Sequence, residues 1–167
     1  MNLKEYEKII AETAIYPKEI TQSFGLAYCM LGLNEEFQEF LDAETTNQKR
    51  KEIGDVIWYV TAMCTEINTT ISQLAEELEN DTLKKYASAD YVQKKIIRLN
   101  GKVKKYYRDN VDYSGAIKEV LKEVLFYIIS NSHNELSEIL SMNYTKLIKR
   151  RETNTLHGEG DNREEQV

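Results

Sequence analysis

The chain has 167 residues, a formal net charge of −6, 41% hydrophobic residues and 30% charged residues. A chain of this length can bury one core but is short for two ordinary domains, and its hydrophobic content favours a folded protein over a disordered one. The negative net charge argues against a nonspecific nucleic-acid binder, because such proteins gain affinity from Lys and Arg that replace phosphate counterions.

Residues that interrupt helices are scarce, with one Pro and seven Gly. This composition predicts an all-α fold, a bundle of about six or seven helices. No run of about 18 apolar residues occurs, and the N-terminal MNLKEYEKII carries charges where a signal peptide has its apolar segment. We therefore expect a cytoplasmic protein with no membrane contact. Cys29 and Cys64 lack the CxxC spacing of a zinc or redox site and are expected to be buried small hydrophobes.

Apolar residues at helical spacing predict the helices in chain order. The predicted helices cover residues 3–15, 19–43, 46–63, 71–83, 91–109, 117–128 and 136–148. Capping-box spacing predicts three helix starts, at Thr45 with Gln48, Thr70 with Gln73, and Ser132 with Glu135. Residues 1–152 form one predicted domain, and the polar residues 153–167, which lack periodicity, are expected to form a tail.

A weak internal repeat appears when KEIGDVIWYV at 51–60 is set against EVLKEVLFYI at 119–128, so that Asp55 falls on Glu123. An apolar pattern of this kind is common among amphipathic helices, so a chance match is an alternative to a true internal repeat. The two halves differ in charge, because the first carries the acidic pairs and the predicted helix 91–109 is the most basic part of the chain.

Two acidic segments, EEFQE at 35–39 and EIGD at 52–55, each place two carboxylates three residues apart. Residues i and i+3 share one helix face, and a short connection makes the two helices antiparallel neighbours. Four carboxylates would then converge and repel one another unless a hard divalent cation, Mg²⁺ or alternatively Mn²⁺, neutralised them. The predicted metal ligands are Glu36, Glu39, Glu52 and Asp55.

The alternative is that these acids decorate solvated helix faces, since Glu is a common surface residue of helices. Both pairs are embedded in apolar sequence, FQEFL and GDVIWYV, which favours at least partial burial. A ferritin-like di-iron site would need Glu-x-x-His pairs, and neither His133 nor His157 follows a Glu at that spacing.

The runs GLNEEFQEFLDA and KEIGDVIWYVTAMCTEI resemble the MazG-like family of the all-α nucleoside triphosphate pyrophosphohydrolase superfamily, whose signature is EExxE followed by ExxD. The segments at 3–17, 101–110 and 143–164 resemble further parts of that family. One departure stands out: the basic GKVKKYYRD follows the ExxD segment instead of preceding it. The chain therefore resembles two fused, divergent helix-pair copies, one with the acids and one with the bases.

The resemblance implies hydrolysis of a nucleoside triphosphate substrate to the monophosphate and pyrophosphate, with Mg²⁺ as cofactor. It implies catalytic roles for Glu35, Glu36 and Glu39, with Glu35 as an outer ligand or a group that orients water. Candidate contacts to the triphosphate are Lys102, Lys105, Arg108, Lys146 and Arg150. Trp58 could stack on the base or belong to the core.

The sequence is compatible with other functions. One is a catalytically idle helical module that binds nucleotides or a partner, and another is a hydrolase of a guanosine alarmone. A homodimer is also compatible with the resemblance, although a fused repeat could replace the interface of such a dimer.

Overall fold

The computed structural model describes residues 1–14, 24–80, 88–109 and 111–156. Within these ranges the protein is all-α, with seven helices and no strand, as predicted. The helices are α1 (Leu3–Thr13), α2 (Phe24–Asp42), α3 (Thr46–Glu66), α4 (Ile71–Asn80), α5 (Ala89–Asp109), α6 (Ser114–Asn131) and α7 (Leu136–Glu152). The predicted helix ends that fall within 15–23 and 81–87, and the part of the predicted tail at 157–167, lie outside the described residues.

Two of the three predicted capping boxes are confirmed. The Thr45 hydroxyl accepts a hydrogen bond from the Gln48 backbone N–H at 3.2 Å, and the Gln48 side chain accepts one from the Thr45 N–H at 2.9 Å. Thr70 and Gln73 make the same reciprocal pair at the start of α4. These bonds satisfy N–H groups that have no partner within the first turn of a helix.

The third predicted cap is wrong. The Ser132 hydroxyl donates to the Ile129 carbonyl at 2.8 Å instead of capping α7, and the Glu135 carboxylate pairs with Arg50 at 3.1 Å. The chain reverses between α6 and α7 through His133 and Asn134, whose φ angles are positive. A hydroxyl in such a turn can bond the carbonyl of the preceding helix, an alternative that sequence spacing does not reveal.

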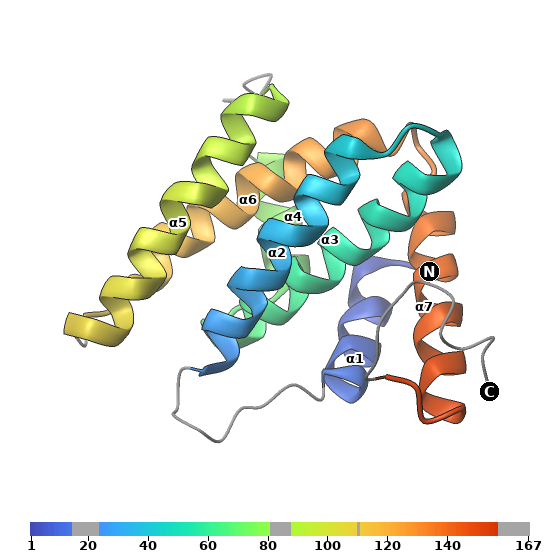
Figure 1. The fold of residues 1–167 in the computed structure, drawn as a ribbon, viewed down its shortest axis with the longest axis horizontal. Helices are drawn as coiled ribbons and strands as arrows, with labels where there is room; N and C mark the ends of the chain where they lie inside the picture. Colours follow the sequence, from blue (N-terminus) through green and yellow to red (C-terminus); the bar gives the residue numbers. More distant parts are fainter. Residues whose placement is uncertain (15–23, 81–87, 110, 157–167) are drawn as a thin grey trace.

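The four long helices α2, α3, α5 and α6 pack in two pairs. α2 packs against α3 and α5 packs against α6, while α2 also contacts α5 and α3 contacts α6 (Figure 1). The segments matched by the weak repeat, 51–60 and 119–128, lie on α3 and α6, the second helix of each pair. The packing is compatible with a fused repeat, and the repeat itself stays a prediction.

The remaining helices, α1, α4 and α7, gather around α3. α3 contacts each of them in addition to α2 and α6. All seven helices contribute to one hydrophobic core cluster, which includes Tyr6 of α1, Leu74 of α4 and Leu140 of α7. The buried residues of α3 fall between Glu52 and Cys64, and polar residues in that part of the helix are held close to other helices.

Glycines set the close approach of α2 to α3. A Cβ at Gly32 would lie 2.1 Å from the Tyr59 ring, and one at Gly25 would lie 2.5 Å from the Glu66 carboxylate. Side chains of α3 therefore occupy the space above these two glycines. This contact fixes the register of the antiparallel pair on which the acidic segments lie.

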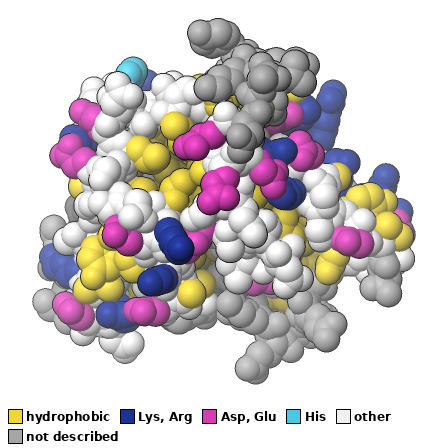
Figure 2. Space-filling model, turned by 180° about the vertical axis from the view of Figure 1, so that it is seen from behind, with side chains coloured by type: hydrophobic (Ala, Val, Ile, Leu, Met, Phe, Trp, Pro, Cys, Tyr) yellow, Lys and Arg dark blue, Asp and Glu magenta, His cyan; other side chains and the backbone are white. Residues whose placement is uncertain are grey.

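The face opposite to that of Figure 1 carries acidic and basic side chains interspersed among hydrophobic ones (Figure 2). Ion pairs between helices include those that Glu77 of α4 forms with Lys118 and Lys122 of α6. None of the helices in the described part of the chain combines the length and apolarity needed to cross a bilayer.

Candidate metal centre

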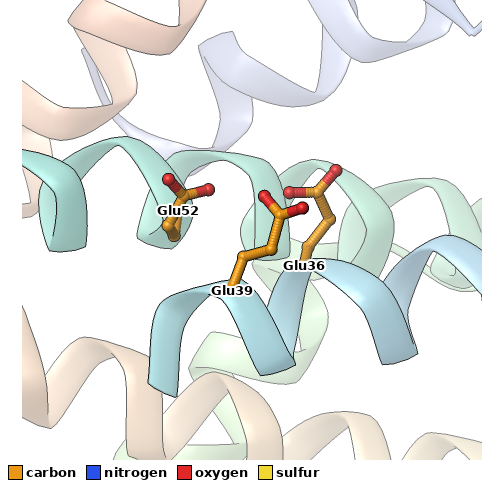
Figure 3. Close-up of side chains that lie close together, drawn as sticks. All are labelled: Glu36, Glu39 and Glu52. Carbon is orange, nitrogen blue, oxygen red and sulfur yellow. The ribbon is translucent and has the colours of Figure 1, made fainter. Parts of the chain in front are cut away.

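The glutamates of the acidic segments converge between α2 and α3. One carboxylate oxygen from each of Glu36, Glu39 and Glu52 lies within 4.8 Å of the others. Glu36 and Glu39 project from α2 toward Glu52 on α3, and the three carboxylates meet in the space between the helices (Figure 3). Glu52 is buried, Glu36 is half-buried and Glu39 is exposed, so the cluster is open to solvent on one side.

The helix register explains this convergence. Gly32 faces Tyr59 across the pair. Four residues further along α2 is Glu36, and four residues back along α3 is Asp55; another three residues in each direction reach Glu39 and Glu52. Because both pairs are spaced by about one helical turn, the position of Glu36 lies opposite that of Asp55, and the position of Glu39 lies opposite that of Glu52.

Burial and neighbouring negative charges raise the pKa of Glu36 to about 8, with Asp55 the largest charge contribution, followed by Glu39. Lys146 acts in the opposite direction. Burial is the larger cause of this shift, and the neighbouring carboxylates add to it, so Glu36 ionises less readily than an exposed glutamate.

Asp55 does not join the three glutamates. Its carboxylate accepts hydrogen bonds from Lys146 Nζ, at 2.5 and 2.6 Å, and from Asn143 Nδ2 at 2.8 Å. Both partners belong to α7. The structure thus brings three of the four predicted ligands together and places the fourth beside them, bound to a cation of the protein.

The donor set fits Mg²⁺. Octahedral Mg²⁺ holds oxygen ligands at about 2.1 Å, so ligand oxygens lie about 3 to 4 Å from one another. The three glutamates come close to this spacing, and the exposed Glu39 has room to adjust. Carboxylate oxygens are hard ligands that suit Mg²⁺ or Mn²⁺. Burial, and then the neighbouring carboxylates, raise the pKa of Glu36, and a divalent cation would lower it again by favouring the ionised form.

The predicted phosphate contacts fall into two groups. Lys146 lies beside the carboxylates through its ion pair with Asp55. Arg150 is buried and lies one turn further along α7, on the same helix face as Asn143 and Lys146. Lys146 is therefore next to the candidate centre, and Arg150 lies on the face of α7 that carries Lys146.

Lys102, Lys105 and Arg108 lie elsewhere. α5 runs antiparallel to α2, since the Tyr107 hydroxyl accepts from the Ala27 N–H at 2.8 Å and Asn34 bonds Asn100 at 3.1 Å. Asn34 and Glu36 are two residues apart on α2, about 200° around the helix, so they point to opposite flanks. The bases of α5 lie along the flank away from the carboxylates.

Trp58 and Glu35 have individual surroundings. Trp58 is half-buried, packs edge-on against Tyr59 and donates from Nε1 to the Thr13 hydroxyl at 3.4 Å. These contacts fix the indole against α1 and the core. Glu35 is exposed on α2, next to Glu36 but turned about 100° from it.

Two residues near the site carried no signal in the sequence. Tyr6 of α1 is fully buried, and its hydroxyl donates to Asn143 Oδ1 at 2.5 Å. Burial, and then the charge of Asp55, raise the pKa of Tyr6. Asn143 is 4% exposed and bridges Tyr6 to Asp55. A Tyr in an amphipathic helix and an Asn far along the chain become recognisable only once α1, α3 and α7 are packed.

No family model, curated protein or solved structure matches this chain. The MazG-like resemblance therefore stays a prediction.

Proposed function

We propose that this protein is a Mg²⁺-dependent nucleotide pyrophosphohydrolase that cleaves nucleoside triphosphates to monophosphates and pyrophosphate. The observation that carries the proposal is the convergence of Glu36, Glu39 and Glu52 from two helices, with Asp55 held beside them by a lysine. Surface acids do not need such a lysine, because solvent already screens their charge.

The metal would be held by the carboxylates of α2 and α3. When bound, Mg²⁺ supplies charge neutralisation for phosphate oxygens and lowers the pKa of a coordinated water. Glu36, Glu39 and Glu52 would hold the ion, with Asp55 beside them as a fourth candidate ligand. The exposed Glu35 would orient a water by accepting a hydrogen bond from it.

Cations of α7 would bind the triphosphate. Lys146 carries its charge at the edge of the carboxylate cluster, where anionic phosphate oxygens would arrive. Arg150, one turn away on the same face, offers a planar group suited to phosphate. Lys102, Lys105 and Arg108 remain predicted contacts that would require a second chain or a movement of α5, because they lie on the other flank of α2.

The test measures pyrophosphate release from a panel of canonical and modified nucleoside triphosphates, with and without Mg²⁺. We expect release with at least one substrate, and a loss of 100-fold or more in kcat for Glu39→Gln. Glu44→Gln is the matched control, because Glu44 is an exposed acid just beyond the end of α2. It should retain wild-type rates.

The panel also includes a guanosine tetraphosphate or pentaphosphate, which tests the alarmone alternative. No release from any compound would overturn the enzyme proposal. If calorimetry then showed nucleotide binding without turnover, the chain would be the idle binding module considered above.

A further inference from the structure

A buried chain of hydrogen bonds connects the first helix to the acidic cluster. Tyr6 of α1 donates to Asn143 of α7, and Asn143 donates to Asp55 of α3. Tyr6 is 0% exposed and Asn143 is 4% exposed. Three helices distant in sequence therefore meet at one carboxylate.

We propose that Tyr6 is a positioning residue: its hydroxyl fixes the Asn143 amide so that Asn143 holds Asp55 in a defined orientation beside the glutamate cluster. The inference rests on the proposed function for its consequence in catalysis. The positioning itself is a statement about the protein alone.

The direction of each hydrogen bond follows from the chemistry of the groups. An ionised carboxylate can only accept, so the NH₂ of Asn143 must face Asp55. The oxygen of the same amide then faces Tyr6, whose hydroxyl is the donor it requires. Without this donor, a half-turn of the amide would aim Oδ1 at Asp55, and two acceptors would oppose each other.

The backbone around Asn143 supports a fixed arrangement. A Cβ at Gly54 would lie 3.0 Å from Asn143 Cβ and Nδ2, so the absence of a side chain at 54 lets α7 approach α3. The Tyr6 hydroxyl also lies 3.4 Å from the Gly54 carbonyl. Asn143 is thus confined between α1 and α3, and its amide is held at both ends, by the Tyr6 hydroxyl at Oδ1 and by the Asp55 carboxylate at Nδ2.

Positioning of this kind has a known effect at metal sites. Groups that orient a ligand from behind typically change metal affinity by about 10-fold to 100-fold when they are removed. Asp55 lies beside three glutamates, two from α2 and one from α3. A loose Asp55 would add a mobile negative charge to the cluster.

The experiment measures Mn²⁺ affinity by electron paramagnetic resonance and follows the Asn143 side-chain amide by ¹⁵N NMR. The variants are Tyr6→Phe, Asn143→Ala and the double variant. Thr13→Val is the control, since it removes a different buried hydroxyl of α1, one that donates to the Ile9 carbonyl and accepts from Trp58 Nε1. Thermal unfolding of each variant confirms that it is folded.

We expect Tyr6→Phe to weaken Mn²⁺ binding about 10-fold, and Thr13→Val to change it less than about twofold. In Asn143→Ala, the further change Tyr6→Phe should have no effect on affinity, because both act through the same amide. Additive effects of the two changes would overturn the proposal, since a general loss of packing does not depend on Asn143.

The NMR measurement separates this proposal from that of the enzyme. If the wild-type protein bound no Mn²⁺, the proposed metal site would be wrong. The NMR signal of the Asn143 side-chain amide would then still test whether Tyr6 positions Asn143. Faster exchange of that amide with solvent in Tyr6→Phe, but not in Thr13→Val, would support the role of Tyr6. An unchanged amide signal would overturn it.

Discussion

Glu36 makes the metal-free protein sensitive to pH. Its pKa is about 8 in the folded protein, against an ordinary value of 4.5. Because the folded pKa is the higher one, the protonated form favours folding. The contribution of Glu36 to the free energy of unfolding is fully present below about pH 4.5 and is lost as the pH rises through about 8.

The size of the effect follows from this difference. One pKa unit corresponds to about 1.36 kcal/mol, which sets an upper value of about 5 kcal/mol. Solvent reaches part of the cluster, and screening reduces the loss to about 2 to 3 kcal/mol. For a chain of this length that is a fall of about 5 to 10 °C in Tm between pH 5 and pH 9.

The assay is thermal unfolding by circular dichroism in EDTA, from pH 5 to pH 9. Glu36→Gln removes the charge and keeps the shape, so its Tm should vary less with pH and should exceed that of the wild type at pH 9. Glu35→Gln, on the exposed neighbour, should follow the wild-type curve. A Glu36→Gln protein that is less stable than wild type at pH 9 would refute the reasoning.

The remaining predictions concern the metal, the ion pair and the helix contacts. Mg²⁺ at 100 times its Kd should raise the stability of the wild type at pH 8 by about 2.7 kcal/mol, and EDTA should reverse this; a Glu39→Gln protein that kept the response would exclude Glu39 as a ligand. Lys146→Met should lower stability in EDTA by about 2 kcal/mol, because it leaves Asp55 without its cation; urea unfolding with an unchanged midpoint would contradict this. Gly32→Ala should destabilise by about 2 to 3 kcal/mol through its clash with Tyr59. Gly101→Ala, where a Cβ meets no atom within 4 Å, should stabilise by about 0.8 to 1 kcal/mol. If thermal unfolding showed that both alanine variants were stabilised, or that both were destabilised, the packing around these two glycines would be contradicted.

The local features of the fold could be predicted from the sequence. Thr45 with Gln48 marked the start of α3 because a capping box depends only on residues three apart. The convergence of Glu36, Glu39 and Glu52 also followed from local rules, since one-turn spacing and a short loop fix which faces meet. These predictions succeeded because few atoms far along the chain influence them.

The features that the sequence did not reveal depend on distant packing. The orientation of Asp55 is set by Asn143 and Lys146, and no sequence pattern near Asp55 predicts its contact with α7. The bases of α5 carry the expected charge, but the antiparallel contact with α2 places them on the flank away from the carboxylates. Sequence spacing gives the face of a helix and leaves the choice of neighbour open.

The ion pair between Asp55 and Lys146 joins residues 91 positions apart in the chain. During synthesis, α2 and α3 leave the ribosome long before α7, and two helices of this length can pair within that interval. The nascent hairpin would then hold its carboxylates together with no lysine from α7 to balance them. Cations of the surrounding solution, Mg²⁺ among them, are the counter-charge present at that moment, so the order of translation exposes the acidic cluster to metal before the protein supplies its own cation.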